Sequence, residues 1–208
     1  MTHNPPLNAP LERVATIANE AVSAYNCAGQ SSGGILNRET EWIKLIAKGD
    51  LKAFERLCRT YQQPLFGYLI RMLGDRGAAE EAVNDVLHAI WKGADRYNGD
   101  AQPGSWIFGI ARHKALDRIR RPNQVTDDID EQDLTAPQGE SSLFLKDTVA
   151  NALARLSPEQ REVIELTFFI GFSYQEIASV ADCPVNTVKT RMYHAKQKLK
   201  RILARESS

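Results

Sequence analysis

The segment from Asp182 to Leu203, DCPVNTVKTRMYHAKQKLKRIL, has side chains whose types and spacing suit contact with a polyanion. Its apolar residues recur at helical spacing and share one face, which contains Val185, Val188, Met192, Ala195, Leu199 and Ile202. The opposite face contains Asn186, Thr190, Tyr193, His194, Gln197 and Arg201, flanked by Lys189, Lys196 and Lys200. Because no acidic residue lies between Thr187 and Ala204, the pattern favours a DNA-binding helix over a solvated surface helix.

A short helix and a tight turn are predicted directly before this segment. Residues 173–181, SYQEIASVA, have helical apolar spacing, Asp182 and Cys183 form the turn, and Pro184 begins the next helix. A short helix, a turn of three or four residues and a longer basic helix make up a helix-turn-helix. In that arrangement the second helix presents its N-terminal residues to base edges in the major groove.

Residues 39–121 are predicted to be helical as well. Gly49 and Asp50 separate two helices, a further helix ends near Gly93, and another begins at Ser105 and stops at Pro122. The apolar faces of these helices are expected to pack into a core, and they include Leu51, Trp91, Trp106 and Ile119. For the two tryptophans, a core position is favoured over stacking on bases.

Two capping boxes are predicted in the C-terminal part of the chain. The sequences SPEQ (157–160) and SYQE (173–176) place a serine at the N-cap and a glutamine or glutamate three residues later. No strand-like alternation is found in the sequence, so the predicted fold class is all-α, with two helical domains.

Composition divides the chain into four parts. They are an N-terminal extension (1–38), a helical domain (39–121), a flexible acidic linker (122–145) and a second helical domain (146–208). The extension holds three prolines, a segment (11–25) that forms either one amphipathic helix or a disordered tail, and a flexible stretch at 28–34. The linker is rich in aspartate and cannot bury enough apolar surface to fold alone.

The overall composition excludes several classes of protein. The 26 basic and 26 acidic residues cancel, so any charged surface must come from segregation along the chain. The three cysteines, Cys27, Cys58 and Cys183, are far apart and form no metal-binding or disulfide spacing, so we expect no metal and no cofactor. Because no signal peptide or membrane span is found, a cytoplasmic location is expected.

The two helical parts resemble one protein family. Residues 156–203, from LSPEQREV to KLKRIL, resemble the −35-reading domain of bacterial extracytoplasmic-function (ECF) sigma factors. Residues 78–99, AAEEAVNDVLHAIWKGADRYNG, resemble the polymerase-binding segment of that family, and 104–121, GSWIFGIARHKALDRIRR, its −10-reading helix. The resemblance covers about residues 40–205. It implies a promoter-specificity subunit of RNA polymerase, which is not an enzyme by itself.

The resemblance also implies where the partners bind. Polymerase contacts, chiefly to the clamp helices of the β′ subunit and also to β, are expected at Glu81, Asn84, Asp85 and Leu87. The −10 element is expected to meet Asn98, Asp100, Ser105, Arg112, His113, Lys114, Arg118, Arg120 and Arg121. The loop before that helix would hold a base flipped from the duplex, which costs a few kcal/mol of lost stacking.

Contacts to the −35 element are expected at Asn186, Thr187, Lys189, Thr190, Arg191, Tyr193 and His194. Relatives often have arginine where His194 stands. Because a neutral histidine cannot make the bidentate contact of arginine to guanine, we expect an altered −35 preference here.

The family further implies control by an anti-sigma factor that masks polymerase-binding surfaces, and a linker that follows a basic channel near the RNA exit. A stand-alone helix-turn-helix regulator is the main alternative, but it leaves residues 79–121 unexplained. An enzyme with a metal or thiol site at Cys58, Cys183, His88 and His113 has no supporting ligand spacing.

Overall fold

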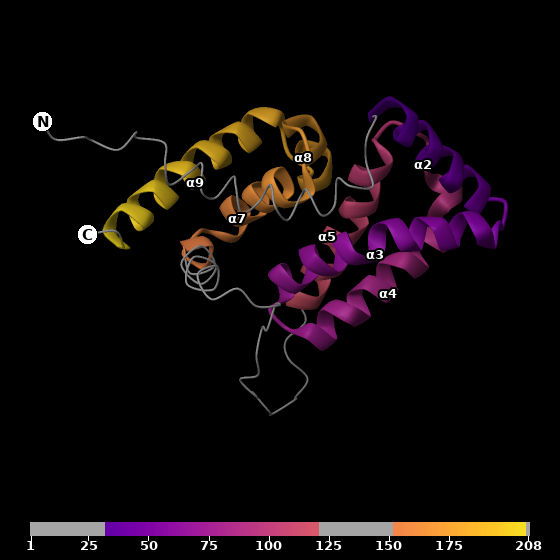
Figure 1. The fold of residues 1–208 in the computed structure, drawn as a ribbon, viewed down its shortest axis with the longest axis horizontal. Helices are drawn as coiled ribbons and strands as arrows, with labels where there is room; N and C mark the ends of the chain where they lie inside the picture. The colour runs from indigo at the N-terminus through magenta and orange to yellow at the C-terminus, as the bar shows by residue number, and fades with distance from the viewer. Residues whose placement is uncertain (1–31, 121–151, 207–208) are drawn as a thin grey trace, which may run out of the picture.

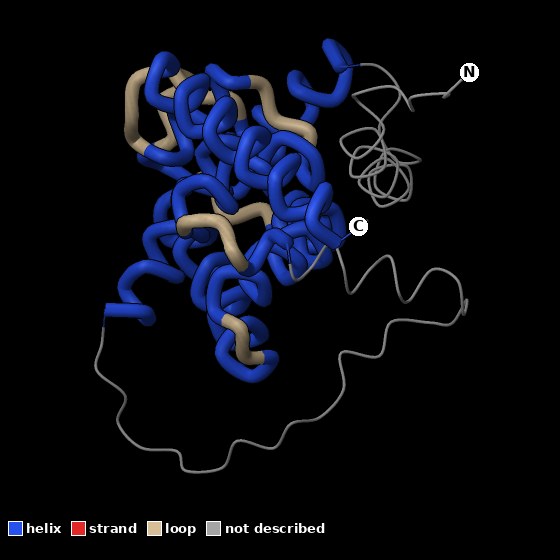
Figure 2. The backbone as a smooth tube through the Cα atoms, turned by 90° about the vertical axis from the view of Figure 1, so that its left-hand side faces the viewer, coloured by secondary structure: helices blue, strands red, loops and turns tan. Residues whose placement is uncertain are grey.

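The computed structural model describes residues 32–120 and 152–206, and every element in these ranges is a helix (Figure 2). The helices are α2 (Ser32–Ile46), α3 (Leu51–Leu73), α4 (Arg76–Gly93), η1 (Ala94–Arg96), α5 (Pro103–Arg120), α7 (Pro158–Glu165), η2 (Leu166–Ile170), α8 (Tyr174–Ala181) and α9 (Val185–Glu206). The all-α prediction is therefore confirmed for the described part of the chain. Arg121, the acidic linker and the extension up to residue 31 lie outside the described residues.

The first group of helices, α2 to α5, packs around one apolar core. Helix α3 is the central element, because it contacts α2, α4 and α5. Its start follows from local chemistry: Gly49 adopts φ 86°, and the side chain of Asp50 accepts hydrogen bonds from the backbone N–H groups of Lys52 and Ala53. The predicted break at Gly49 and Asp50 is thus confirmed, and α4 ends at Gly93 as expected.

The second group, α7 to α9, contains both predicted capping boxes. The Ser157 hydroxyl accepts from the Gln160 N–H, and the Gln160 side chain accepts from the Ser157 N–H. Ser173 and Glu176 form the same reciprocal pair at the start of α8. After α8, Asp182 adopts a left-handed conformation with φ 48°, which turns the chain into α9.

The two groups pack against each other, as Figure 1 shows, with α5 in contact with α8. Between them lie aromatic side chains: the ring of Phe172, in the loop after η2, stands edge-on to Phe108 of α5 at 5.3 Å between centroids. Phe108 is also edge-on to Tyr68 of α3 at 5.4 Å. This packing joins residues far apart in the sequence and positions α5 next to the C-terminal group.

Several expectations about element bounds and burial are wrong. Helix α5 begins at Pro103 rather than Ser105, since proline is well suited to the first turn of a helix. Helix α2 begins at Ser32, inside the stretch expected to be flexible. The glycines at 33 and 34 disfavour a helix by about 1 kcal/mol each, a weak preference that the context of the whole helix overrides. Leu51 and Ile119 are 68% and 56% exposed, because each lies at a helix end that the core does not cover.

Trp91 and Trp106 both pack against the core, as expected. Trp91 of α4 lies 5.1 Å from Phe54 of α3, measured between ring centroids, and Trp106 of α5 lies 5.1 Å from Tyr97. None of the described helices is both long enough and apolar enough to span a membrane.

Candidate nucleic-acid interface

Helix α9 has the two faces that its sequence predicts. Its apolar face is buried against the rest of the second group, with Val188, Met192, Ala195 and Leu199 at most 2% exposed. The polar face is exposed and contains Asn186, Lys189, Thr190, Tyr193, His194, Gln197 and Arg201. Because core packing uses only the apolar face, the N-terminal half of the polar face is available to an external partner.

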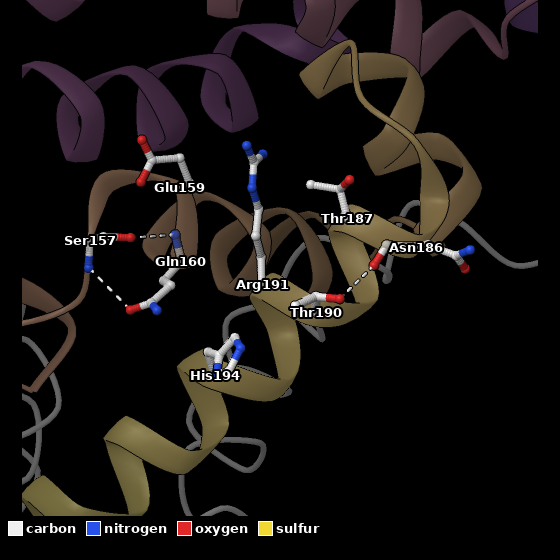
Figure 3. Close-up of a pocket in the computed structure, with 8 residues that line it drawn as sticks. All are labelled: Ser157, Glu159, Gln160, Asn186, Thr187, Thr190, Arg191 and His194. Carbon is white, nitrogen blue, oxygen red and sulfur yellow. Dashed lines mark hydrogen bonds between the residues drawn. The ribbon is translucent and has the colours of Figure 1, made fainter.

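The start of α9 borders a groove against the first turn of α7 (Figure 3). From α9, the groove is lined by Asn186, Thr187, Thr190, Arg191 and His194; from α7 and its cap, by Ser157, Glu159 and Gln160. These five residues of α9 are among the seven expected to meet the −35 element. The other two, Lys189 and Tyr193, are exposed beside the groove, and Tyr193 is 60% exposed.

One acidic residue at this groove was not anticipated from the sequence. Glu159 is exposed in the first turn of α7, and the pKa of its carboxyl is lowered first by a backbone hydrogen bond and then by the Ser157 side chain, with smaller contributions from Arg191 and Arg112. An ionised carboxylate beside the reading face repels phosphates and attracts Arg191. The position of Glu159 at this groove was hard to predict from the sequence, because a glutamate there indicates only the N-terminus of a helix.

Helix α5 presents its expected −10 residues unequally. His113 and Arg120 are exposed, Lys114 is half-buried, and the ring Nδ1 of His113 lies 2.8 Å from the Gly109 carbonyl oxygen. Arg112 is only 18% exposed, because its Nε donates to the Glu162 carboxylate of α7 at 2.9 Å. In this conformation, therefore, Arg112 is bound to the second group of helices instead of facing solvent.

Arg118 joins two of the predicted interfaces. Its guanidinium donates to the Glu81 carboxylate at 3.0 Å and to the Asp85 carboxylate at 2.7 Å. Glu81 and Asp85 lie one turn apart on α4, so a single arginine from α5 bridges both of the carboxylates expected to contact polymerase. The hydrogen bond to Asp85 and that to Glu81 both raise the pKa of Arg118, so its charge is retained.

The polymerase-facing residues predicted on α4 share one side of the helix. Glu81, Asn84 and Asp85 are exposed, whereas Leu87 is half-buried and packs against the core. The structure thus brings the three polar residues together on a solvent-facing surface, with Leu87 at its apolar margin.

The loop before α5 is held by hydrogen bonds among its own residues. The Asn98 side chain bonds to Asp100, whose N–H in turn donates to the Asn98 Oδ1 at 3.1 Å, and Gly99 between them has φ 85°. Asn98 and Asp100 are exposed. Ser105 is different, because it is 2% exposed and its hydroxyl has no hydrogen-bond partner among the described residues. In this conformation the Ser105 hydroxyl is not presented to DNA.

The described residues contain no cluster of three or more His, Cys, Asp or Glu side chains able to hold a metal ion. Burial raises the pKa of the Cys58 thiol, which disfavours the reactive thiolate. Cys183 lies in the turn before α9, where its sulfur accepts a long contact of 3.8 Å from Arg191.

Comparisons with known proteins place both groups of helices in one family. The model of Sigma-70 region 2 matches residues 57–124, and that of Sigma-70 region 4 matches residues 146–199, so together they span more than half of the chain. The ECF RNA polymerase sigma factor SigL of Mycobacterium tuberculosis is 30% identical over 142 residues, which are 65% of this chain and 80% of that protein.

Two solved structures have a similar fold. CnrH, in complex with the cytosolic domain of CnrY, is 26% identical with a TM-score of 0.63, over 80% of this chain and 97% of that one. The sigma factor RpoE of Bartonella quintana, in complex with the anti-sigma factor NepR, is 27% identical with a TM-score of 0.61, over 74% of this chain and 98% of that one. The chain therefore belongs to the ECF sigma factors, initiation factors that bind core RNA polymerase and direct it to promoters.

Proposed function

We propose that this sigma factor divides its contacts among three surfaces. The exposed face of α4 binds core polymerase, α5 with the loop before it reads and opens the −10 element, and the N-terminal half of α9 reads the −35 element. The observation that carries the proposal is the exposed polar face of α9, whose opposite face is buried in the core.

The α4 surface suits a cationic partner. Glu81 and Asp85 are 73% and 51% exposed as side chains, and Asn84 lies beside them. One arginine offsets two carboxylates, so the surface keeps a net negative charge that favours encounter with a basic helix such as one from the β′ clamp. Leu87 supplies apolar area at the margin.

The α9 surface suits the major groove. Lys189 supplies phosphate neutralisation, while Asn186, Thr190 and His194 have groups that can bond to base edges. The Thr190 hydroxyl donates to the Asn186 carbonyl at 2.9 Å, which fixes its rotamer and leaves its lone pairs free to accept from a base.

Control by an anti-sigma factor in the cytoplasm is part of the proposal. Its support is that a sigma factor of similar fold, RpoE of Bartonella quintana, was solved with the anti-sigma factor NepR. An anti-sigma factor acting on this chain would have to cover the α4 face, the α9 face, or both.

Paired variants test these assignments in transcription with purified core polymerase. Asp85→Asn should weaken binding to core polymerase. Glu55→Gln is the control and should leave that binding unchanged. Each change removes one carboxylate charge and one exposed ion pair, which Asp85 makes with Arg118 and Glu55 makes with Arg59.

Lys189→Ala should reduce initiation from promoters that depend on a −35 element.

Lys198→Ala is the control for Lys189→Ala, because it removes the same charge from an exposed position in the following half of α9. Equal loss with both lysine variants would mean that α9 attracts DNA only by its total charge. Normal core binding by Asp85→Asn would remove α4 from the polymerase interface.

A further inference from the structure

One arginine lies between two carboxylates on the surface formed by α4 and α5. Nη1 of Arg118, on α5, donates to Oε2 of Glu81 at 3.0 Å, and its Nη2 donates to Oδ2 of Asp85 at 2.7 Å. The Arg118 side chain is 26% exposed, whereas those of Glu81 and Asp85 are 73% and 51% exposed. The carboxylates, and not the arginine, are therefore the part of this cluster that is most open to a partner.

The two carboxylates are neighbours because they lie one turn apart on α4. Two like charges at this spacing on a helix repel each other. A planar guanidinium can donate to both at once, which offsets the repulsion and restricts the rotamers of both acids. Arg118 bonds to only one oxygen of each acid, so Oε1 of Glu81 and Oδ1 of Asp85 can accept hydrogen bonds from a partner.

The same two bonds make Arg118 poorly suited to contact promoter DNA. Both of its terminal nitrogens already donate to carboxylates of α4. A phosphate that approached this guanidinium would also approach Glu81 and Asp85, whose negative charges repel it. Arg120, at the end of the same helix, is exposed and has a guanidinium better placed for such a contact.

We infer that Arg118 is a positioning residue of the polymerase-binding surface, where it holds the carboxylates of Glu81 and Asp85 in the arrangement that a basic partner helix meets. The inference rests on the proposed role of α4 in binding core polymerase, and it moves Arg118 from the expected −10 contacts to that interface. Side chains that are ordered before binding lose less freedom when the partner arrives. For two acidic side chains this difference changes affinity by roughly 5-fold or more.

Net charge and positioning predict opposite effects when Arg118 is removed. Arg118→Gln leaves both carboxylates without their cation, so the surface becomes more negative. A surface that acts only through its net charge would then bind a basic helix more tightly. A surface that depends on positioning binds it more weakly, and we expect this effect to dominate because salt screens exposed charges.

Titration of core polymerase onto the full-length chain, labelled at its N-terminus, tests the inference. Arg118→Gln should weaken binding by roughly 5-fold or more. Arg59→Gln is the matched control and should leave binding unchanged, because Arg59 is likewise paired with a glutamate but lies on α3. In a chain that already carries Glu81→Gln and Asp85→Asn, Arg118→Gln should cause little further loss, since residues that act through each other are not additive.

Equal or tighter binding by Arg118→Gln would overturn the inference, as would the full loss in the chain without the two carboxylates. Should Arg118→Gln lose helix content by circular dichroism, Arg118→Lys replaces it in the test. Lysine keeps the charge but lacks the planar fork, so it should also bind core polymerase more weakly than the wild type. Wild-type affinity of a folded Arg118→Lys would then overturn the inference.

Promoter binding by the saturated holoenzyme provides a second readout. Loss of a phosphate contact lowers the slope of log affinity against log salt concentration by about one. Arg118→Gln should leave this slope unchanged, and a lower slope would show that Arg118 contacts DNA instead. Normal core binding by the chain with Glu81→Gln and Asp85→Asn would refute the proposed function of α4. Weakened binding by that chain, with normal binding by Arg118→Gln, would refute only the role of Arg118.

Discussion

Among single residues, His194 is the one for which we predict the most direct effect on promoter choice. It is exposed on α9 and lines the groove beside Glu159. His194→Arg should change base preference within the −35 element toward guanine, by about 1–3 kcal/mol, because arginine makes a bidentate contact to guanine that a neutral histidine cannot make. Transcription from a set of −35 variants measures the change.

Gln197→Arg is the matched control for His194→Arg. It adds one positive charge to the same exposed face of α9, about one turn further along the helix. If His194 reads a base, Gln197→Arg raises initiation from all promoters similarly and only His194→Arg alters their ranking. The same uniform increase with both variants would show that position 194 contacts only the DNA backbone.

The burial and exposure of the α9 side chains were predictable, because the helical period alone decides which face each residue lies on. Every residue of its predicted apolar stripe from Val188 to Ile202 is buried, and its polar side is exposed. By contrast, the partners of Arg112 and Arg118 were not predictable. Each arginine lies on a helix with exposed neighbours, and its carboxylates come from α7 and α4, 50 and at least 33 residues away in sequence.

Among the elements, α8 depends most on its cap. It has only eight residues, and short helices gain little from propagation, so the Ser173 box supplies a large share of its local stability. Ser173→Ala should lower the free energy of unfolding by about 1 kcal/mol, measured by urea denaturation. Ser179→Ala makes the same chemical change at an exposed interior position of α8 and should cause no loss. Equal effects of the two would mean that the cap does not stabilise α8.

The contact of α7 with α3 should make stability depend on pH. Burial raises the pKa of Glu165 from 4.5 to about 7, against the opposing effects of Arg71 on α3 and Arg161 on α7, with Glu162 adding to the rise. The folded chain therefore keeps a proton that the unfolded chain releases. The stability linked to this proton is complete below pH 4.5 and is lost as the pH rises through about 7.

Thermal or urea unfolding between pH 5 and 8 measures this dependence. The free energy of unfolding of the wild type should fall with rising pH relative to that of Glu165→Gln, whose amide does not titrate. Glu55→Gln should retain the wild-type slope, because Glu55 is exposed on α3. A wild-type slope identical to that of Glu165→Gln would show that Glu165 is ionised throughout this range.

Helix starts were predictable where a side chain caps them, and less so elsewhere. Asp50, Ser157 and Ser173 all cap helices as their sequence pattern indicates. The single π-helical turn η2 was not anticipated, because Leu166–Ile170 has the composition of an ordinary apolar helix and its widened turn ends only at Gly171, which has φ 84°. Such a turn depends on tertiary packing, which local propensity does not describe.

For the whole molecule, the order of two helical units was predictable, but their mutual packing was not. Each unit has its own capped, amphipathic helices, and these are local features. The contact between the units includes Tyr68, Glu162 and Phe172, which do not stand out in their own segments, and Arg112, which was expected to meet the −10 element instead. The same packing explains why Arg112 of α5 is covered, whereas Lys189 and His194 of α9 are exposed.

Binding and initiation with purified core RNA polymerase test the central claim most directly. The full-length chain, added to core polymerase free of other sigma factors, should form a stable complex and initiate from a promoter with its own −35 and −10 elements, while the isolated chain binds the same duplex weakly. Tight binding of that duplex by the isolated chain, with no complex and no initiation on core polymerase, would contradict the account.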